Sequence, residues 1–416
     1  MGGRVYGLLG RKLGHSWSVP IHQALGCGDY RLIELEPEDL PAFLAREDIG
    51  GLNVTIPYKR DVMPHCDEID EAARAIGSVN TIVRREGKLF AYNTDAAGFC
   101  YMARRAGISF ADRKTVILGS GGASLMAQAM VRQLGSREVA VISRSGEDNY
   151  ETLSRHADAD ILVNATPVGM FPGNGDAPVD LDAFPALSGV LDLIYNPRRT
   201  ALLQQAERRG LPRSDGLPML VAQAVAAEEH FFDAPIPEGE TERILDKLRR
   251  EMTNLVLIGM PGSGKTTVGR ALANLTGREA IDLDSRIEER AGRSIPEIFA
   301  REGEAAFRAL ERQAAEEAGR LTGKILLTGG GIVKDERNYA PLHQNGRIYH
   351  LVRPLNLLPT DGRPLSQGAD LAAMWREREP LYRRFRDAQI DNTGTVAETA
   401  RAIWRDFCEH SGAERP

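Results

Sequence analysis

A glycine-rich segment in the second half of the 416-residue chain constrains the fold more than any other stretch. Residues Gly259–Thr266 fit the pattern G-x-x-x-x-G-K-[S/T] at each fixed position, between an apolar run at 254–258 and a helical run at 267–275. Glycines in such a turn let backbone N–H groups surround a phosphate at the start of a helix. The pattern therefore predicts a P-loop, in which Lys265 reaches the β- and γ-phosphates of a nucleotide and Thr266 binds Mg²⁺.

Short apolar runs alternate with helical stretches along most of the chain. Alternation of this kind predicts an α/β fold, in which parallel sheets are covered by helices. The predicted strands are Val5–Leu9, Thr115–Leu118, Glu138–Ile142, Asp160–Asn164, Val190–Ile194, Leu255–Ile258, Ile325–Thr328 and Arg347–Leu351.

A domain boundary is expected near Thr253. Proline and glycine residues interrupt the chain at 235–239, and residues 240–252 then have the periodicity of an amphipathic helix. A new strand follows almost at once, so no flexible linker separates the two parts of the chain. The apolar face of the predicted helix consists of Ile244, Leu245, Leu248 and Met252.

The residues that follow the P-loop form an ordered series. Taken singly, each arginine of the series would be interpreted as a solvated surface residue, and Asp282 and Asp284 as turn or capping residues. In this order behind a P-loop, the series closely resembles the shikimate kinase family over residues 254–408. It comprises Asp282-Leu283-Asp284, Gly292–Ile295, Ile298-Phe299, Gly303-Glu304, Phe307-Arg308, Glu311, Gly329–Gly331, Arg363–Leu365 and Arg378–Tyr382.

This resemblance implies an acceptor that is a small hydroxylated carboxylic acid. Arg308 and Arg378 would bind its carboxylate through paired N–H donors. Asp284 would hold the acceptor hydroxyl and take up its proton, while Asp282 would support Mg²⁺ together with Thr266. The resemblance further assigns the close approach to the acceptor to Gly329, Gly330 and Gly331, and the nucleotide contacts to Gly262, Ser263, Gly264, Lys265, Thr266 and Thr267.

A lid segment at 354–368 is also implied, with Arg363 neutralising charge on the transferring phosphoryl group. The lid departs from the family pattern, because Leu358-Pro359 stands where a second basic residue is usual. The departure concerns the contacts of the lid with the nucleotide and not the reaction.

A second glycine-rich turn lies in the first half, at Gly119–Ser124 after a predicted strand. It departs from G-x-G-x-x-G at Ser124, so by itself the turn leaves a dinucleotide site and a plain tight turn equally open. The next predicted strand ends in Ser143-Arg144-Ser145. An acidic residue at that place would favour NAD, whereas Arg144 suits the 2′-phosphate of NADP.

Further polar motifs of the first half again occur in a fixed order. Together they resemble the shikimate dehydrogenase family over residues 4–252. They are His15–Ser18, Asn53–Lys59, Ser78–Thr81, Asn93–Asp95, Asn164–Thr166, Asp192–Tyr195, Asp215-Gly216 and Met219–Gln223.

The resemblance implies that Lys59 and Asp95 form the catalytic pair, because reduction of a ketone needs a proton delivered to its oxygen. Asp95 could in addition cap a helix that starts at Ala96. One departure concerns Asp148, which stands where the family often has a second arginine for the cofactor. The implied substrate-binding residues are Ser16, Ser18, Thr55, Asn80, Asp95, Tyr195 and Gln223. The implied NADP-binding residues are Gly119, Gly121, Gly122, Ala123, Ser143, Arg144 and Gly216.

The two resemblances together imply a two-lobed dehydrogenase with a Rossmann-like NADP lobe, followed by a P-loop kinase domain of α/β/α type. The substrate lobe would comprise residues 1–98 and 216–252, the NADP lobe 99–215 and the kinase domain 253–410. The expected activities are NADPH-dependent reduction of 3-dehydroshikimate to shikimate, and MgATP-dependent phosphorylation of shikimate to shikimate 3-phosphate. The alternatives are a quinate-type dehydrogenase joined to another small-molecule P-loop kinase, and a nucleotide-sensing regulator without activity.

Composition narrows the choice of partners. The net charge of −6 argues against a general nucleic-acid binder. The four cysteines show no C-x-x-C spacing, which favours buried thiols in a reducing compartment. No apolar run approaches the roughly 20 residues of a membrane span. We therefore expect a cytoplasmic enzyme with small-molecule partners, no nucleic acid and no membrane; its oligomeric state stays open.

Overall fold

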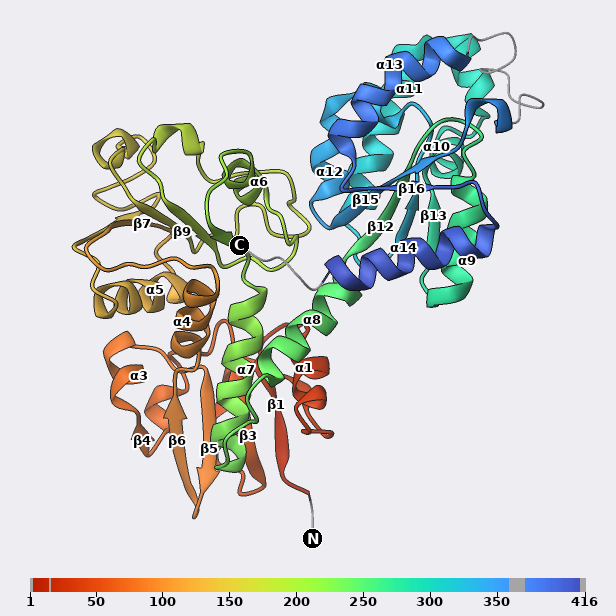
Figure 1. Ribbon diagram of the computed structural model, residues 1–416. Helices are drawn as coiled ribbons and strands as arrows, with labels where there is room; N and C mark the ends of the chain where they lie inside the picture. Colours follow the sequence, from red (N-terminus) through yellow and green to blue (C-terminus); the bar gives the residue numbers. More distant parts are fainter. Residues whose placement is uncertain (1–2, 15, 359–370, 412–416) are drawn as a thin grey trace. The chain divides into compact units, whose positions relative to one another are not determined.

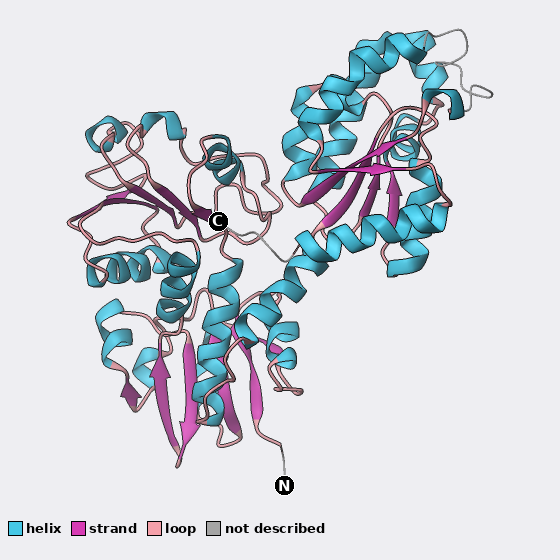
Figure 2. Ribbon diagram, viewed as in Figure 1, coloured by secondary structure: helices cyan, strands magenta, loops and turns pink. Residues whose placement is uncertain are grey.

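The computed structural model describes residues 3–14, 16–358 and 371–411. It falls into two compact units. One contains the residues up to Met170 together with Asp176–Leu245, and the other contains Phe171–Gly175 and the residues from Asp246 onward. The α/β fold class is confirmed, because helices and sheets of mainly parallel strands alternate in both units (Figures 1 and 2). None of the helices described is long and apolar enough to cross a membrane.

The first sheet has six strands in the order β2-β1-β3-β5-β6-β4. It is mixed and not parallel throughout, because β5 runs antiparallel to both β3 and β6. The turn between β5 and β6 places Glu86 and Gly87 at φ 50° and 81°. Positive φ at both central residues is typical of the two-residue hairpin turn whose backbone twist matches the twist of the flanking strands. The elements of this region are Val5–Gly10 (β1), Ser18–Ala24 (α1), Arg31–Glu34 (β2), Leu40–Leu44 (α2), Ile49–Val54 (β3), Glu68–Ile69 (β4), Glu71–Ile76 (α3), Thr81–Arg85 (β5), Lys88–Tyr92 (β6), Asp95–Arg105 (α4), Leu217–Phe232 (α7) and Glu240–Met252 (α8).

The second sheet has five parallel strands in the order β11-β10-β9-β7-β8. Its strands carry apolar residues on both faces: Val116 and Leu118 of β7 enter one core, and Ile117 enters the other. This is the pattern of a parallel sheet with helices on both sides. Its elements are Lys114–Leu118 (β7), Gly122–Gln133 (α5), Glu138–Ile142 (β8), Ile161–Asn164 (β9), Gly189–Asp192 (β10), Ala201–Arg208 (α6) and Arg213–Ser214 (β11).

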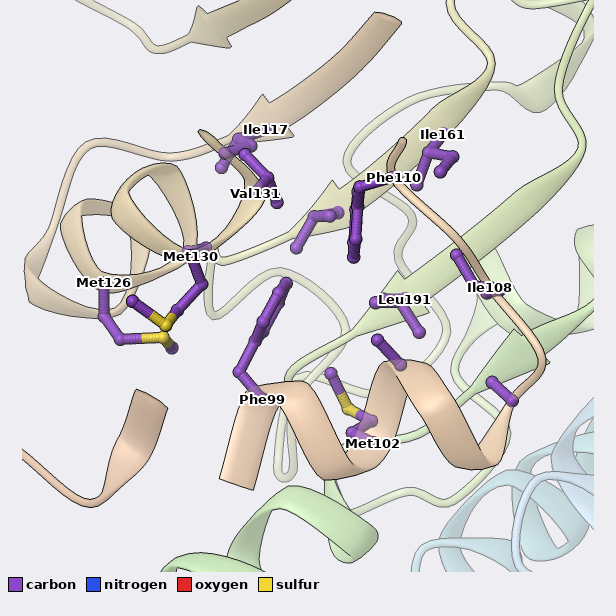
Figure 3. Close-up of a cluster of buried hydrophobic side chains, with 14 of the residues drawn as sticks. Phe99, Met102, Ile108, Phe110, Ile117, Met126, Met130, Val131, Ile161 and Leu191 are labelled. Atoms are coloured by element: carbon purple, nitrogen blue, oxygen red, sulfur yellow. The ribbon is translucent and has the colours of Figure 1, made fainter. Parts of the chain in front are cut away.

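Helix α4 links the first sheet to the core beneath the second one. Phe99 and Met102 of α4 point into the cluster that contains Met126 and Met130 of α5 and the ring of Phe110 (Figure 3). The rings of Phe99 and Phe110 have their centroids 5.8 Å apart. Burial of these large side chains, each worth roughly 1.5–3 kcal/mol, fixes one side of α4.

The other side of α4 lies against α7. A Cβ atom added at Gly98 would come within 2.5 Å of the Met219 carbonyl oxygen and 3.1 Å of the Gln223 Cβ. Only glycine therefore allows this distance between the two helices without displacement of α7. The contact brings the first turn of α4, which starts at Asp95, close to the turn of α7 that carries Gln223.

The second unit contains a parallel five-stranded sheet in the order β13-β14-β12-β15-β16. Leu255 and Leu257 of β12 pack with α9 and α14, whereas Val256 and Ile258 pack with α11 and α13. Alternate residues thus cover opposite faces, which gives an α/β/α sandwich. Its elements are Asn254–Ile258 (β12), Lys265–Thr276 (α9), Ala280–Asp282 (β13), Leu283–Ala291 (α10), Ile295–Gly319 (α11), Ile325–Leu327 (β14), Tyr339–His343 (α12), Gly346–Val352 (β15), Leu371–Phe385 (α13), Ala388–Asp391 (β16) and Val396–His410 (α14).

The predicted amphipathic helix is present as α8, Glu240–Met252. The four apolar residues of its predicted face, Ile244, Leu245, Leu248 and Met252, are all at most 2% exposed. The predicted strand at 190–194 is displaced, because β10 ends at Asp192. The carboxylate of Asp192 accepts the backbone N–H of Ile194, and this bond turns the chain out of the sheet.

Candidate active sites

The Lys59–Asp95 pair is formed in the first unit. The Lys59 ammonium donates to the Asp95 carboxylate at 2.5 Å, and the side chains are 24% and 15% exposed. Lys59 follows β3 and its carbonyl oxygen accepts the N–H of Val79, which ties it to the neighbouring segment. Asp95 is the first residue of α4, after Thr94 as N-cap, and bonds Lys59 instead of capping a helix that starts at Ala96. An accessible ammonium held by a carboxylate is suited to proton transfer.

Asn80 is anchored beside this pair. Its amide donates to the Thr94 hydroxyl at 3.1 Å, and its amide oxygen accepts the Thr94 N–H at 2.7 Å. Asn80 therefore lies against the residue that precedes Asp95. Thr55 is held at the end of β1, where its N–H donates to the Leu9 carbonyl oxygen at 2.9 Å.

The remaining predicted substrate residues lie on three other elements. The Ser16 hydroxyl donates to the Ser18 hydroxyl at 3.1 Å at the start of α1. Gln223 lies on α7, against Gly98 of α4. Tyr195 follows β10, and burial raises the pKa of its hydroxyl. Within the described part of the chain, no hydrogen bond joins Ser16, Ser18 or Tyr195 to Lys59 or Asp95.

The loop of Tyr195 is held by two features. Gly216 approaches it so closely that an added Cβ would lie 2.2 Å from the Leu193 carbonyl oxygen. Asp192 is fully buried and accepts hydrogen bonds from Asn164, Ile194 and Thr200. Asp192 is therefore a positioning residue for this loop. The sequence motif contains Asp192 and the local donor Ile194, but the burial of Asp192 and the donor from Asn164 come from the tertiary fold.

The glycine turn after β7 fits a dinucleotide. Gly119 has φ 105°, and an added Cβ would lie 3.0 Å from the Ala165 carbonyl oxygen. Gly121, Gly122 and Ala123 are exposed at the N-terminus of α5, where no side chain caps the helix. The turn lies between β7 and β9, where the strand order reverses, as is usual for a nucleotide site in such a sheet. Ser124, the departure from the motif, is buried and accepts a hydrogen bond from Gln128.

Arg144 is exposed just after β8, where a 2′-phosphate would be bound. The neighbouring Ser143 donates its N–H to the Asp148 carbonyl oxygen at 3.2 Å. The Asp148 carboxylate lies 3.2 Å from Nε2 of His156 and 3.7 Å from the Arg155 guanidinium. The residue that replaces the family's second arginine therefore faces an arginine and a histidine of this chain.

The P-loop of the second unit has the expected conformation. Gly262 and Gly264 have φ 84° and 93°, which favours glycine. The Lys265 ammonium is 2.8 Å from the Gly259 carbonyl oxygen and 3.0 Å from that of Met260. The hydroxyl of Ser263 is buried and has no hydrogen-bond partner among the described residues. A buried hydroxyl without a partner, next to glycines with positive φ, is suited to hydrogen bonding with the phosphates of ATP.

The segment Gly329–Gly331 after β14 brings the acceptor-side residues together. A Cβ atom added at Gly329 would lie 2.7 Å from Oδ1 of Asp284. At Gly330 it would lie 2.6 Å from Pro261 of the P-loop, and at Gly331 it would lie 2.7 Å from the Arg308 guanidinium. The Arg378 guanidinium donates to the Gly330 carbonyl oxygen at 3.1 Å. The two arginines and Asp284 thus surround one glycine segment next to the P-loop.

Two carboxyl groups near this segment have raised pKa values. Burial raises the pKa of Asp284, and the charge of Asp282 raises it further. A raised pKa brings a carboxylate closer to the value that suits acceptance of a proton. Burial also raises the pKa of Glu311, which holds the Arg308 guanidinium at 2.7 Å.

The residues present fit a magnesium ion that is bound together with a nucleotide. Asp282 caps α10 through the N–H groups of Asp284 and Ser285, so the capping interpretation is confirmed. One oxygen of its carboxylate makes both contacts. Thr266 and Thr267 are exposed in the first turn of α9. Mg²⁺ is usually held by one or two protein groups plus substrate phosphates. Arg363 lies outside the described residues.

The comparisons with known proteins match both halves. The family description "Shikimate dehydrogenase substrate binding domain" matches residues 8–82, and "Shikimate kinase" matches residues 261–407. The chain is 38% identical over 266 residues to the shikimate dehydrogenase (NADP(+)) of Clostridium beijerinckii, covering 59% of this chain and 98% of the relative.

Two solved structures resemble the first half. A chorismate mutase/shikimate 5-dehydrogenase fusion protein from Clostridium acetobutylicum has a TM-score of 0.57 and 36% identity, over 60% of this chain and 98% of that chain. The shikimate 5-dehydrogenase of Thermus thermophilus in complex with NADP(H) and shikimate has a TM-score of 0.53 and 31% identity, over 58% and 97%.

The environment of Asp192 predicts how stability depends on pH. Burial raises its pKa from 3.8 to about 7, against the opposing hydrogen bonds from Thr200, Ile194 and Asn164. The folded chain thus keeps this proton where the unfolded chain has lost it, and the contribution to the free energy of unfolding falls as the pH rises from about 4 to about 7. Asp192→Asn removes this loss, so its free energy of unfolding relative to wild type should rise by about 4 kcal/mol between pH 4 and pH 8.

Urea unfolding, followed by hydrogen exchange in peptides of the first unit, measures this difference. Asp182→Asn, an exposed residue of the same region, is the control and should follow the wild type at every pH. Parallel pH curves for Asp192→Asn and the wild type would contradict the assignment.

Proposed function

Since the chain belongs to the shikimate dehydrogenase family and carries a shikimate kinase domain behind it, we propose that its two sites act in turn on the same small acid. It is a bifunctional shikimate-pathway enzyme, which reduces 3-dehydroshikimate with NADPH and phosphorylates shikimate with MgATP. The observation that carries this function is the presence of both reaction centres: Lys59 bound to Asp95 in one unit, and Asp284 with two arginines beside a P-loop in the other.

In the dehydrogenase site, NADPH supplies the hydride. We propose that Lys59 delivers the proton to the ketone oxygen, and that Asp95 orients the ammonium and contacts the substrate. The other substrate contacts are assigned to Ser16, Ser18, Thr55, Asn80, Tyr195 and Gln223. Hydroxyl and amide groups of this kind distinguish the hydroxyls and carboxylate of the acid by hydrogen bonding.

In the kinase site, MgATP supplies the phosphoryl group. We propose that Arg308 and Arg378 bind the carboxylate of shikimate, which places its 3-hydroxyl at Asp284. Asp284 accepts the hydroxyl proton as the oxygen attacks, and its raised pKa supports that role. Lys265 and the P-loop N–H groups hold the phosphates, and Arg363 is assigned to charge neutralisation.

The domain limits are part of the proposal. Residues 1–98 and 216–252 form the substrate lobe, 99–215 the NADP lobe, and 253–410 the kinase domain. A cytoplasmic location is supported by the four cysteines, all of which are free.

A coupled assay tests the proposed sequence of reactions. The intact chain, incubated with 3-dehydroshikimate, NADPH and MgATP, should form shikimate 3-phosphate. Quinate replaces shikimate in a parallel oxidation assay with NADP⁺. A faster reaction with quinate, or no phosphorylated product, would sink the proposal.

The catalytic pair gives a sharp mutational test. Lys59→Ala and Asp95→Ala should each lower the kcat of ketone reduction by roughly 10²-fold or more, the usual range for loss of an acid–base group. Kinase activity of the same preparations should stay at the wild-type value, which controls for folding and concentration. Reduction at a near wild-type rate in either variant would show that the pair is wrongly assigned.

Metal removal should separate the two activities. EDTA should abolish phosphorylation and spare NADPH-dependent reduction, because only the kinase site combines phosphates with Thr266 and Asp282. No group of three or more metal-binding side chains occurs among the residues described. Excess Mg²⁺ should restore the kinase, as measured by shikimate 3-phosphate formation. Loss of both activities without unfolding is the outcome that contradicts the prediction.

Arg144 should set the preference for NADPH. Arg144→Ala removes a charge-assisted contact to the 2′-phosphate, worth about 1.5–3 kcal/mol, so kcat/KM for NADPH should fall roughly 10- to 100-fold. NADH lacks this phosphate, and its kcat/KM should change little. Arg208→Ala, at an exposed arginine of α6, is the matched control. An equal loss with both cofactors would mean that Arg144 is structural.

A further inference from the structure

A buried polar pair joins the two helices that carry proposed substrate residues. His22 on α1 and Glu228 on α7 are 206 positions apart in sequence, and both side chains are 0% exposed. Nδ1 of His22 and Oε1 of Glu228 are 2.6 Å apart, a short hydrogen bond. The catalytic chemistry described above uses neither residue.

The ring of His22 is also fixed from the side. It stacks on Tyr30, with ring centroids 3.9 Å apart and an interplanar angle of 8°. The Tyr30 hydroxyl donates to Oδ1 of Asn53 at 2.8 Å, and Asn53 begins the segment that leads to Lys59. The plane of the imidazole is therefore held on β3 as well as on α7.

This arrangement is poorly explained by stability. Within the described residues, Nε2 of His22 and Oε2 of Glu228 have no hydrogen-bond partner. Burial of two polar side chains costs their hydration, and one hydrogen bond offsets little of that cost in the free energy of unfolding. Two packed apolar side chains of similar volume often give an equal or greater stability. What an apolar pair lacks is direction: a hydrogen bond fixes the distance and the angle between two helices.

We propose that His22 and Glu228 are positioning residues that set α1 against α7, so that Ser18 and Gln223 contact the same substrate molecule. Ser18 lies one helical turn before His22 on the same face of α1, and Gln223 lies five residues before Glu228 on α7. The inference rests on the proposed assignment of Ser18 and Gln223 to substrate binding. It predicts an effect on substrate KM and little effect on the chemical step, because Lys59 and Asp95 bond each other and neither lies on α1 or α7.

The test compares variants that keep or lose the directional bond. Glu228→Leu and His22→Phe should each raise the KM for shikimate about tenfold, while kcat changes less than threefold. The KM for NADP⁺ and the kinase activity of the same chain should stay within twofold. Glu228→Gln, whose amide oxygen can still accept a hydrogen bond from His22, should keep KM within threefold of wild type.

A double variant separates positioning from packing. His22→Phe combined with Glu228→Leu replaces the polar pair by an apolar one, and its melting temperature should match or exceed that of the single variants. Its KM for shikimate should nevertheless stay raised. If the double variant recovers the wild-type KM together with the melting temperature, the pair only fills space and the proposal is overturned.

Two controls distinguish this inference from the site assignment. Ser18→Ala and Gln223→Ala test the assignment itself: an unchanged KM in both would overturn the assignment and the inference with it. A raised KM in these, with a wild-type KM in the double variant and in Glu228→Leu, would overturn the inference alone. Glu68→Gln removes an exposed ion pair with Lys88 in the same lobe and should alter neither KM nor melting temperature.

Discussion

The close contact between α4 and α7 at Gly98 determines where the dehydrogenase residues lie. A side chain at this position would meet the Met219 carbonyl oxygen at 2.5 Å, so the helix spacing depends on glycine. On its other side, α4 is held by Phe99 and Met102 in the apolar core that also contains Met126 and Met130 of α5 (Figure 3). A helix fixed on two sides places its first residue, Asp95, in one position, and Asp95 in turn fixes Lys59. The ion pair therefore depends on apolar packing and on one missing Cβ atom.

In the kinase site, too, glycines allow the close approach of charged side chains. Three consecutive glycines follow β14. Asp284, Pro261 and Arg308 lie within 2.6–2.7 Å of the positions that the Cβ atoms of other residues would occupy there. Because the strands are parallel, their carboxyl ends meet at one edge of the sheet, so β12, β13 and β14 supply the P-loop, Asp282 and the glycines together. In both units, the positions of the charged side chains therefore depend on glycine residues.

Sequence patterns are strongest where a short segment contains its own geometry. The P-loop, the glycine turn after β7 and the apolar face of α8 could all be predicted, because each depends on neighbours along the chain. The hairpin β5–β6 could not be predicted, because neither strand is among the apolar runs identified and alternation of strands with helices indicates parallel pairing only. The early end of β10 depends on the orientation of the Asp192 carboxylate, which accepts from Ile194 and is also held by Thr200 and by Asn164 of β9, 28 positions away. The His22–Glu228 pair is the extreme case: 206 positions separate the two residues, and neither lies in a motif with a known spacing.

The two sites would recognise one acid with different groups, and the reactions account for the difference. In the kinase, the acceptor must approach a polyanionic nucleotide, so the assigned arginines and Lys265 offset the repulsion between carboxylate and phosphates. In the dehydrogenase, the hydride goes to an uncharged ketone, and the assigned hydroxyl and amide groups orient the acid without a strong positive field. A strong positive field would favour the product of the second reaction, which carries a phosphate in addition to the carboxylate, over the substrate of the first. A site of neutral donors with a single paired ammonium binds the acid and gains little from an added phosphate. The phosphorylated product should therefore be a weak inhibitor of the first step, a useful property when both reactions take place on one chain.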